Sequence, residues 1–177
     1  MLVFATLDPE QKHRGLAAFV VERGMEGLTT GSFHGKLGVR AGDTGWIAFN
    51  NVRVPAENLI GDEGEGFKIA MSAIDQGRFT VAAGAVGLIR ASLEASTQYC
   101  HEREAFGQEI GQFQLVKQML AKMVAGMESS RLLVMQAAEM KNRGERNTRE
   151  TSLAKWVACD HAFNAANDAI QIHGAYG

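Results

Sequence analysis

Short apolar runs separated by turn-rich stretches dominate the first 60 residues. The runs are LVFATL at 2–7, GLAAFVV at 15–21 and GWIAFNNVRV at 45–54, and DPEQ, ERGMEG and RAGDTG lie between them. Runs of this length bounded by turn residues predict β-strands, which we expect to pair antiparallel. Val54-Pro55 predicts that the last strand ends there and that the chain leaves the sheet.

From Gly66 onward the apolar residues recur with helical spacing, and both prolines lie before residue 56. This pattern predicts three long helices, at 66–101, 113–142 and 148–173, the first with a break near Gly77 as an alternative. Helices of about 30 residues reach about 45 Å, which is typical of bundles. The predicted fold class is therefore α+β, an antiparallel β segment followed by a long-helix bundle.

The apolar residues of the second and third helices predict which faces turn inward. In the second helix Leu115, Met119, Met123 and Met127 recur every four residues, widened by Val116, Leu120 and Val124. In the third helix the inward set is Leu153, Trp156, Val157, Phe163 and Ile170. Asn147 and Glu150 have capping-box spacing at its start, and Gly174 predicts its end. These faces are broad, so we expect oligomerisation or further sequence to cover part of them.

Composition and charge narrow the function classes. The 177 residues are 46% hydrophobic and 21% charged, which excludes a disordered chain, and the net charge is −2 without a basic tract. Binding to nucleic acid or an anionic membrane is therefore not the expected role. No apolar run approaches about 20 residues, so no membrane insertion is expected. Cys100 and Cys159 form neither a disulfide framework nor a zinc motif, and we expect an intracellular location.

Several local motifs have ordinary structural readings. His101-Glu102 lacks the second His one turn later that a zinc helix needs, because position 105 is Ala. The acidic GDEGEGF at 61–67 repels phosphate and predicts a helix entry. GAVG at 84–87 predicts close helix packing.

The stretch HEREAFGQEIGQFQ at 101–114 interrupts the helical pattern with charged, aromatic and glycine residues. Arg103 beside Phe106-Gly107 suits a bidentate grip on phosphate, while pairing with Glu102 or Glu104 is the alternative. Gln114 offers an amide to a ligand or caps its helix. QIHGAYG at 171–177 is likewise a ligand-contacting helix end or a C-cap.

Four segments together resemble the acyl-CoA dehydrogenase family. KLGVRAGDTGWIAFNNVRVP (36–55) is similar to its KxGxRxSxTxxxxFxxVxVP segment, and GEGFKIAMSAIDQGRFTVAAGAVG (64–87) to its first C-terminal-domain helix. HEREAFGQEIGQFQ resembles its ER-x-x-FG-x-x-I-x-x-x-Q signature, and DAIQIHGAYG its DAxQxxGGxGY-type ending. The family usually has Ser at the position of Gly42 and Gly at that of Ala175. The order of the four segments is the family's.

The resemblance implies FAD as cofactor, with Arg103 reaching the pyrophosphate of the FAD of a neighbouring subunit. The implied cofactor-binding residues are Arg103, Ala105, Phe106, Phe113, Gln114, Gln171, Ile172, His173, Gly174 and Ala175. The implied substrate-binding residues, beside the acyl-CoA, are Asp75, Gln76, Gly77 and Arg78.

The implied activity is dehydrogenation of an acyl-CoA thioester to the trans-2-enoyl-CoA, with electrons passed to an electron-transfer flavoprotein. A carboxylate removes the α-proton while the β-hydride goes to the flavin. In one branch of the family the catalytic Glu stands where this chain has Gly77, and in the other it follows the last motif. We therefore expect no catalytic residue within this chain.

The resemblance also implies a fragment, with residues 1–60 as part of a middle β domain and 61–177 as a truncated C-terminal helical domain. A dimer or tetramer is expected, in the cytoplasm or the mitochondrial matrix. Two alternatives remain open. One is an acyl-CoA oxidase or flavin monooxygenase of the same fold, and the other is a non-catalytic helical assembly module.

Overall fold

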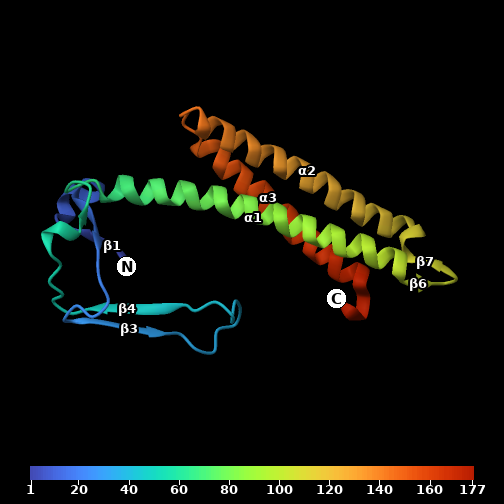
Figure 1. Ribbon diagram of the computed structural model, residues 1–177, viewed down its shortest axis with the longest axis horizontal. Coiled ribbons are helices and arrows are strands. Elements are labelled where there is room, and N and C mark those ends of the chain that lie inside the picture. Colours follow the sequence, from blue (N-terminus) through green and yellow to red (C-terminus); the bar gives the residue numbers. More distant parts are fainter. The chain divides into compact units, whose positions relative to one another are not determined.

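A computed structural model describes all 177 residues, Met1–Gly177. The chain forms two compact units, Met1–Ser72 and Ala73–Gly177. Short antiparallel strands come first and long helices follow, so the α+β class predicted from the sequence is confirmed (Figure 1). None of the helices combines the length and hydropathy that crossing a bilayer requires.

The first unit contains a sheet in the order β1-β2-β5, formed by β1 (Leu2–Thr6), β2 (Leu16–Val20) and β5 (Leu59–Ile60). Both pairings are antiparallel. The middle strand β2 contributes Ala17 and Ala18, which are fully buried. A separate hairpin pairs β3 (Leu28–Ser32) with β4 (Gly45–Phe49), also antiparallel.

Two predictions about the strands were wrong. β3 was not predicted, because LTTGS has only one large apolar residue to mark it. The chain also does not leave the sheet at Pro55, since β5 returns after it and pairs with β2. A short 3₁₀ helix, Ala56–Asn58, leads into β5, and Asn58 Nδ2 donates to the Val20 carbonyl at 2.7 Å, which holds this segment on β2.

Three helices follow: α1 (Gly66–Glu102), α2 (Gln114–Asn142) and α3 (Thr148–His173). Their bounds agree with the prediction to within one residue. The alternative of a break near Gly77 was wrong, because α1 is continuous through that position. A five-residue connection, 143–147, joins α2 to α3, and the two run antiparallel as a helical hairpin in Figure 1.

The core of the helical unit is shared by all three helices. One cluster joins Ile89 and Cys100 of α1 to Met123 of α2 and to Ala162, Ala165 and Ile172 of α3. A second joins Ala82 of α1 to Ala154 and Ala158 of α3. Helix α3 therefore faces its neighbours mainly with alanines, which permit close approach of the helix backbones.

The predicted inward face of α3 was mostly wrong. Trp156 and Phe163 are 66% and 71% exposed, Leu153 and Ile170 are also exposed, and only Val157 is half-buried. In α2 the methionine stripe is confirmed in the middle, with Met123 buried, whereas Leu115 and Val124 are exposed. The large apolar residues of α3 lie opposite its alanine face, and no element of this chain covers them.

The ends of α3 and the glycines of α1 also differ from expectation. Asn147 precedes α3 but its side chain caps nothing, because its Nδ2 donates to the Ala137 carbonyl at 2.8 Å, so the capping box was wrong. Gly174, with φ of 60°, does end α3 as predicted. The close packing predicted at Gly84 and Gly87 was wrong, since a Cβ at either would meet no atom within 4 Å.

Cys100 gives a first testable prediction. It is 1% exposed within the core, and burial raises the pKa of its thiol, so the reactive thiolate is suppressed. We expect iodoacetamide at pH 8 to alkylate Cys100 at least about a hundredfold more slowly in the folded protein than in urea. Peptide mass spectrometry measures both rates, with Cys159 as an internal reference in the same digests. Equal rates in the two conditions would contradict the buried placement.

Candidate functional site

A tight hairpin lies between α1 and α2. β6 (Glu104–Ala105) pairs with β7 (Gln108–Glu109), and the two central residues, Phe106 and Gly107, have φ of 53° and 80°. Positive φ at both positions is the signature of a type I′ turn, a strained conformation for an aromatic residue. The Phe106 side chain is 97% exposed. An almost fully exposed aromatic ring held in a strained turn indicates a binding role.

The base of the hairpin is fixed to the end of α1. His101 Nδ1 lies 3.0 Å from Glu109 Oε2, and the amide of Ile110 donates to the Arg103 carbonyl at 2.9 Å. No group of three or more His, Cys, Asp or Glu side chains could hold a metal ion. These two contacts hold the hairpin in a defined position at the end of α1.

The Arg103 side chain is exposed and takes part in no ion pair. Glu102, one of its two candidate partners, instead accepts a hydrogen bond from Gln98 Nε2 at 2.7 Å. The alternative of a surface ion pair is therefore not what the structure contains. The guanidinium keeps all its donors available for an anionic group.

A pocket of about 700 Å³ opens between the hairpin, the start of α2 and the end of α3. It is lined by Ala105, Phe106, Ile110, Phe113, Gln114, Leu115, Val116, Gln118, Met119, Gln171 and Ile172. The rings of Phe106 and Phe113 meet edge to face with centroids 6.3 Å apart. Apolar walls with a few amide groups are typical of sites for planar, partly polar ligands.

The pocket unites six of the ten residues predicted to bind the cofactor. Arg103, His173, Gly174 and Ala175 do not line it. His173 stacks on Tyr99 with ring centroids 4.4 Å apart, and its Nδ1 lies 2.8 Å from the Ala169 carbonyl. Gly174 and Ala175 form a short 3₁₀ turn, Gly174–Tyr176, directly after α3.

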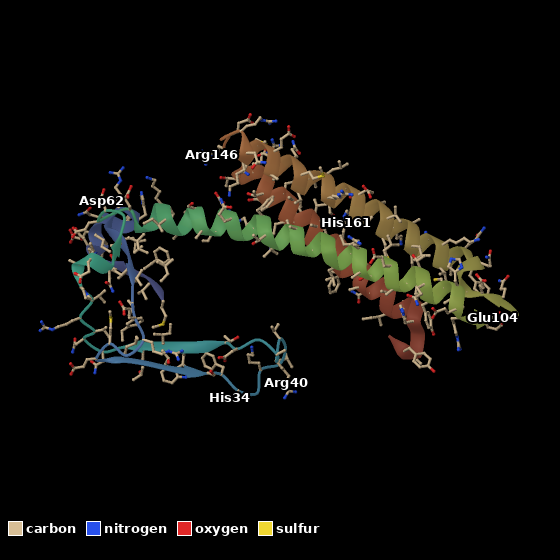
Figure 2. The ribbon with its side chains drawn as sticks, in the orientation of Figure 1. His34, Arg40, Asp62, Glu104, Arg146 and His161 are labelled. Atoms are coloured by element: carbon tan, nitrogen blue, oxygen red, sulfur yellow. The ribbon has the colours of Figure 1, made fainter.

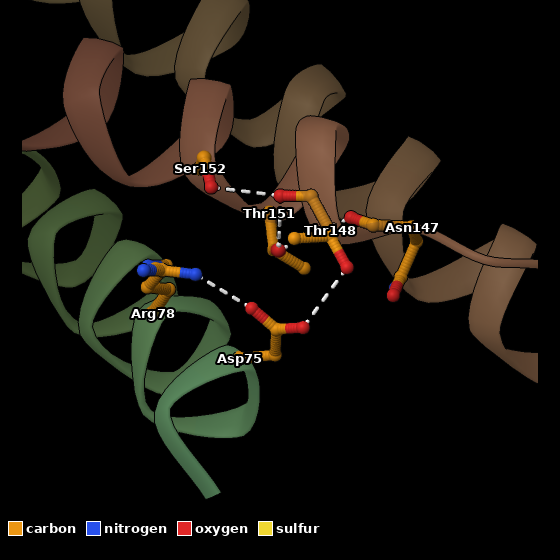
Figure 3. Close-up of polar contacts among 6 residues, drawn as sticks. All are labelled: Asp75, Arg78, Asn147, Thr148, Thr151 and Ser152. Atoms are coloured by element: carbon orange, nitrogen blue, oxygen red, sulfur yellow. Dashed lines mark hydrogen bonds and ion pairs between the residues drawn. The ribbon is translucent and has the colours of Figure 1, made fainter. Parts of the chain in front are cut away.

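The predicted substrate segment lies on α1 and is tied to the end of α2 and the start of α3. Asp75 Oδ1 accepts from Arg78 Nη1 at 2.6 Å, and Asp75 Oδ2 accepts from Thr148 Oγ1 at 2.9 Å (Figure 3). Lys141 Nζ donates to Gln76 Oε1. A Cβ at Gly77 would meet no atom within 4 Å, so the surface at this position is open.

Sequence reasoning missed Thr148 and Lys141. Thr148 contacts a residue 73 positions away in the chain, and neither residue stands in a motif. The signal that remains in the sequence is indirect, since a threonine at the first position of a helix often uses its hydroxyl for a polar contact.

The two candidate regions are far apart along α1. Arg78 and Glu102 are 24 residues apart by subtraction of their numbers, which corresponds to about 36 Å of continuous helix. Figure 2 shows Arg146, in the α2–α3 connection, and Glu104, in the hairpin, at opposite ends of the helical unit. One small molecule therefore cannot contact both regions of the same chain.

A further groove of about 690 Å³ lies between α2 and α3, and none of the predicted cofactor- or substrate-binding residues lines it. His161, labelled in Figure 2, lies against α2 there, with Nδ1 3.2 Å from the Gly126 carbonyl and 3.1 Å from Ser130 Oγ. The His161 side chain therefore links α3 to α2.

Comparison with known proteins agrees with this arrangement. The family described as "Acyl-CoA dehydrogenase, C-terminal domain" matches residues 64–177. An acyl-CoA dehydrogenase of Bacillus subtilis (strain 168) is 42% identical over 176 residues, which are 99% of this chain and 46% of the relative.

Two solved structures have the same fold over nearly the whole chain. One is described as the electron transferring flavoprotein of Acidaminococcus fermentans. Its matching chain has 42% identity and a TM-score of 0.93, and the match covers 99% of this chain and 46% of that chain. The other, PigA with FAD and proline, has 28% identity and a TM-score of 0.93, with 98% of this chain and 45% of that chain covered.

The chain spans about half the length of the curated relatives it matches. The matched residues 64–177 contain all three long helices and the hairpin between α1 and α2. The chain belongs to the acyl-CoA dehydrogenase family.

Proposed function

We propose that this chain provides the helical half of an FAD-dependent acyl-CoA dehydrogenase that converts an acyl-CoA thioester to the trans-2-enoyl-CoA. The observation that carries the proposal is the pocket beside the β6–β7 hairpin. Six residues that the family resemblance assigns to the flavin, from three separate segments, line that one pocket.

The residues of the hairpin end fit the chemistry of a flavin dinucleotide. The free guanidinium of Arg103 suits the pyrophosphate, because its fork can bind two phosphate oxygens. Phe106 and Phe113 offer apolar ring surfaces, and the amides of Gln114 and Gln171, which also line the pocket, offer polar contacts. FAD, when bound, supplies the acceptor for the hydride that leaves the β-carbon.

The substrate end of α1 binds and orients rather than abstracting a proton. Arg78 uses one donor on Asp75 and keeps the others for polar groups of coenzyme A. Asp75 already accepts two hydrogen bonds, and Gly77 has no side chain, so this segment offers no free base. The family resemblance assigns the base to a Glu downstream of the last motif, and its relatives are about twice as long as this chain.

The distance along α1 supports a homo-oligomer, a dimer or tetramer. Because the hairpin and the substrate segment are about 36 Å apart on one helix, the hairpin of one copy would serve the cofactor of another. The exposed Trp156 and Phe163 of α3 provide apolar surface that further sequence or another copy would cover.

The remaining assignments follow from the family. Residues 1–60 would belong to the middle β domain and 61–177 to the C-terminal helical domain. An electron-transfer flavoprotein would receive the electrons, and the structure from Acidaminococcus fermentans named above supports this class of partner. The cytoplasm or the mitochondrial matrix would be the compartment.

The test is to purify the product of the complete reading frame and measure flavin absorbance and dye-coupled oxidation of acyl-CoAs of several chain lengths. We expect bound FAD, turnover with at least one acyl-CoA, and slow reoxidation of the reduced flavin by oxygen. Rapid reoxidation by oxygen would favour an oxidase or monooxygenase. A folded protein without flavin or turnover would contradict the proposal and favour an assembly module.

A further inference from the structure

The Asp75 carboxylate is the meeting point of two elements of the helical unit. Its Oδ1 accepts from Arg78 Nη1, one turn later on α1, at 2.6 Å, and its Oδ2 accepts from Thr148 Oγ1 at 2.9 Å (Figure 3). The Asp75 and Arg78 side chains are 28% and 37% exposed, so both contacts are partly shielded from water. Because Arg78 holds one carboxylate oxygen and Thr148 holds the other, the orientation of the carboxylate plane is fixed.

Thr148 is well placed to hold that carboxylate. It is the first residue of α3, where the helix dipole and the free amide groups favour a neighbouring negative charge. A hydroxyl that donates to a carboxylate forms a charge-assisted hydrogen bond. The other hydroxyls of this turn are directed elsewhere, since Thr151 and Ser152 both donate to backbone carbonyls of α3 or its entry.

The connection that leads into Thr148 is itself held by several side-chain contacts. Asn147 Nδ2 donates to the Ala137 carbonyl at 2.8 Å, and Arg143 pairs with Glu139 at 2.9 Å and Glu145 at 2.7 Å. The Arg143 hydrogen bond holds the pKa of the Glu145 carboxyl below its ordinary value. The Lys141 ammonium adds a second link, to Gln76 on α1. Thr148 therefore donates from an ordered segment.

We propose that Thr148 is a positioning residue, whose hydroxyl fixes the Asp75 carboxylate and thereby aims the Arg78 guanidinium at the coenzyme A portion of the substrate. The proposal rests on the function proposed above. It extends the substrate site from α1 to the first residue of α3. Arg78 donates to Asp75 through one nitrogen only, so its direction depends on how Thr148 holds the other oxygen.

The test compares Thr148→Val with Thr148→Ser in the flavin-loaded product of the complete reading frame. Thr148→Val keeps the shape of the side chain and removes the donor. Because Arg78 would bind substrate and transition state alike, we expect KM for the acyl-CoA to rise about tenfold with kcat unchanged. Thr148→Ser restores the donor and is expected to return KM to within about twofold of the original protein.

Two controls separate positioning from a general structural effect. Thr151→Val removes a hydroxyl from the same turn without touching Asp75, and its KM is expected to stay unchanged. In an Arg78→Gln background, adding Thr148→Val should raise KM no further, because Thr148 acts through Arg78. If Thr148→Val does not fold, Thr148→Ala takes its place in both comparisons.

The outcomes distinguish this inference from the proposed function. If the original protein turns over acyl-CoA while Thr148→Val behaves as Thr151→Val does, the positioning role is wrong and the function stands. A KM effect that adds fully to that of Arg78→Gln also overturns the role. If the original protein neither turns over any acyl-CoA nor binds coenzyme A in calorimetry, the proposed function fails and the positioning role fails with it.

Discussion

Replacing Arg103 by alanine is expected to weaken binding of FAD about 10- to 150-fold in the product of the complete reading frame. The guanidinium is exposed and free of ion pairs, so its loss removes a contact to the ligand and leaves no protein partner unsatisfied. A hydrogen bond to a charged group contributes about 1.5–3 kcal/mol, which gives this range. Flavin fluorescence during titration of the apoprotein measures the dissociation constant.

Arg103→Lys tests whether the fork matters. Lysine keeps the charge but offers a single ammonium, so we expect only part of the affinity to return. Arg131→Ala is the matched control, because Arg131 is also exposed and unpaired but lies in α2, outside the pocket lining. An unchanged dissociation constant for Arg103→Ala, or an equal loss for Arg131→Ala, would refute the assignment of Arg103 to the pyrophosphate.

The helices could be predicted from the sequence because their signal is local. Apolar spacing and the absence of proline after Pro55 give the bounds of α1, α2 and α3 to within one residue. The buried face of α3 could not be predicted in the same way. Periodicity shows on which side of a helix the apolar residues lie, but it does not show which side another helix contacts. In this chain the neighbouring helices pack on the alanines of α3 and leave Trp156 and Phe163 exposed.

Short strands depend on partners that local sequence does not reveal. β5 has only two residues and exists because Asn58 and the edge of β2 hold it. The hairpin at Phe106-Gly107 was expected only as an interruption of the helical pattern, since an aromatic residue at positive φ is not a usual turn signal.

For the candidate site, the sequence motifs supplied the residues and the structure supplied their grouping. The motifs at 101–114 and 171–177 are separated in sequence, and their approach to one pocket depends on how the helices pack. The assignments to flavin and substrate stay predictions. Thr148 was beyond the reach of sequence reasoning, because its role depends on a contact with α1 across the bundle.

Gly66→Ala is expected to destabilise the first unit by about 2–3 kcal/mol. Gly66 is the first residue of α1, and a Cβ there would lie 2.7 Å from the Ala17 carbonyl carbon and 2.8 Å from its Cα. Ala17 is fully buried in the middle strand of the β1-β2-β5 sheet, so backbone atoms, which cannot rotate away as a side chain can, must move. Amide hydrogen exchange of β2 measures the loss, and exchange should become about 30- to 150-fold faster.

Gly84→Ala provides the matched control, since it makes the same substitution in the same helix. A Cβ at position 84 would meet no atom within 4 Å, so only the backbone preference changes. Alanine in a helix interior is favoured over glycine by about 0.5–1 kcal/mol, and this variant should therefore be slightly more stable. Equal effects of the two variants on β2 exchange would contradict this prediction. The stability of the first unit would then depend on contacts other than the close approach of Gly66 to Ala17.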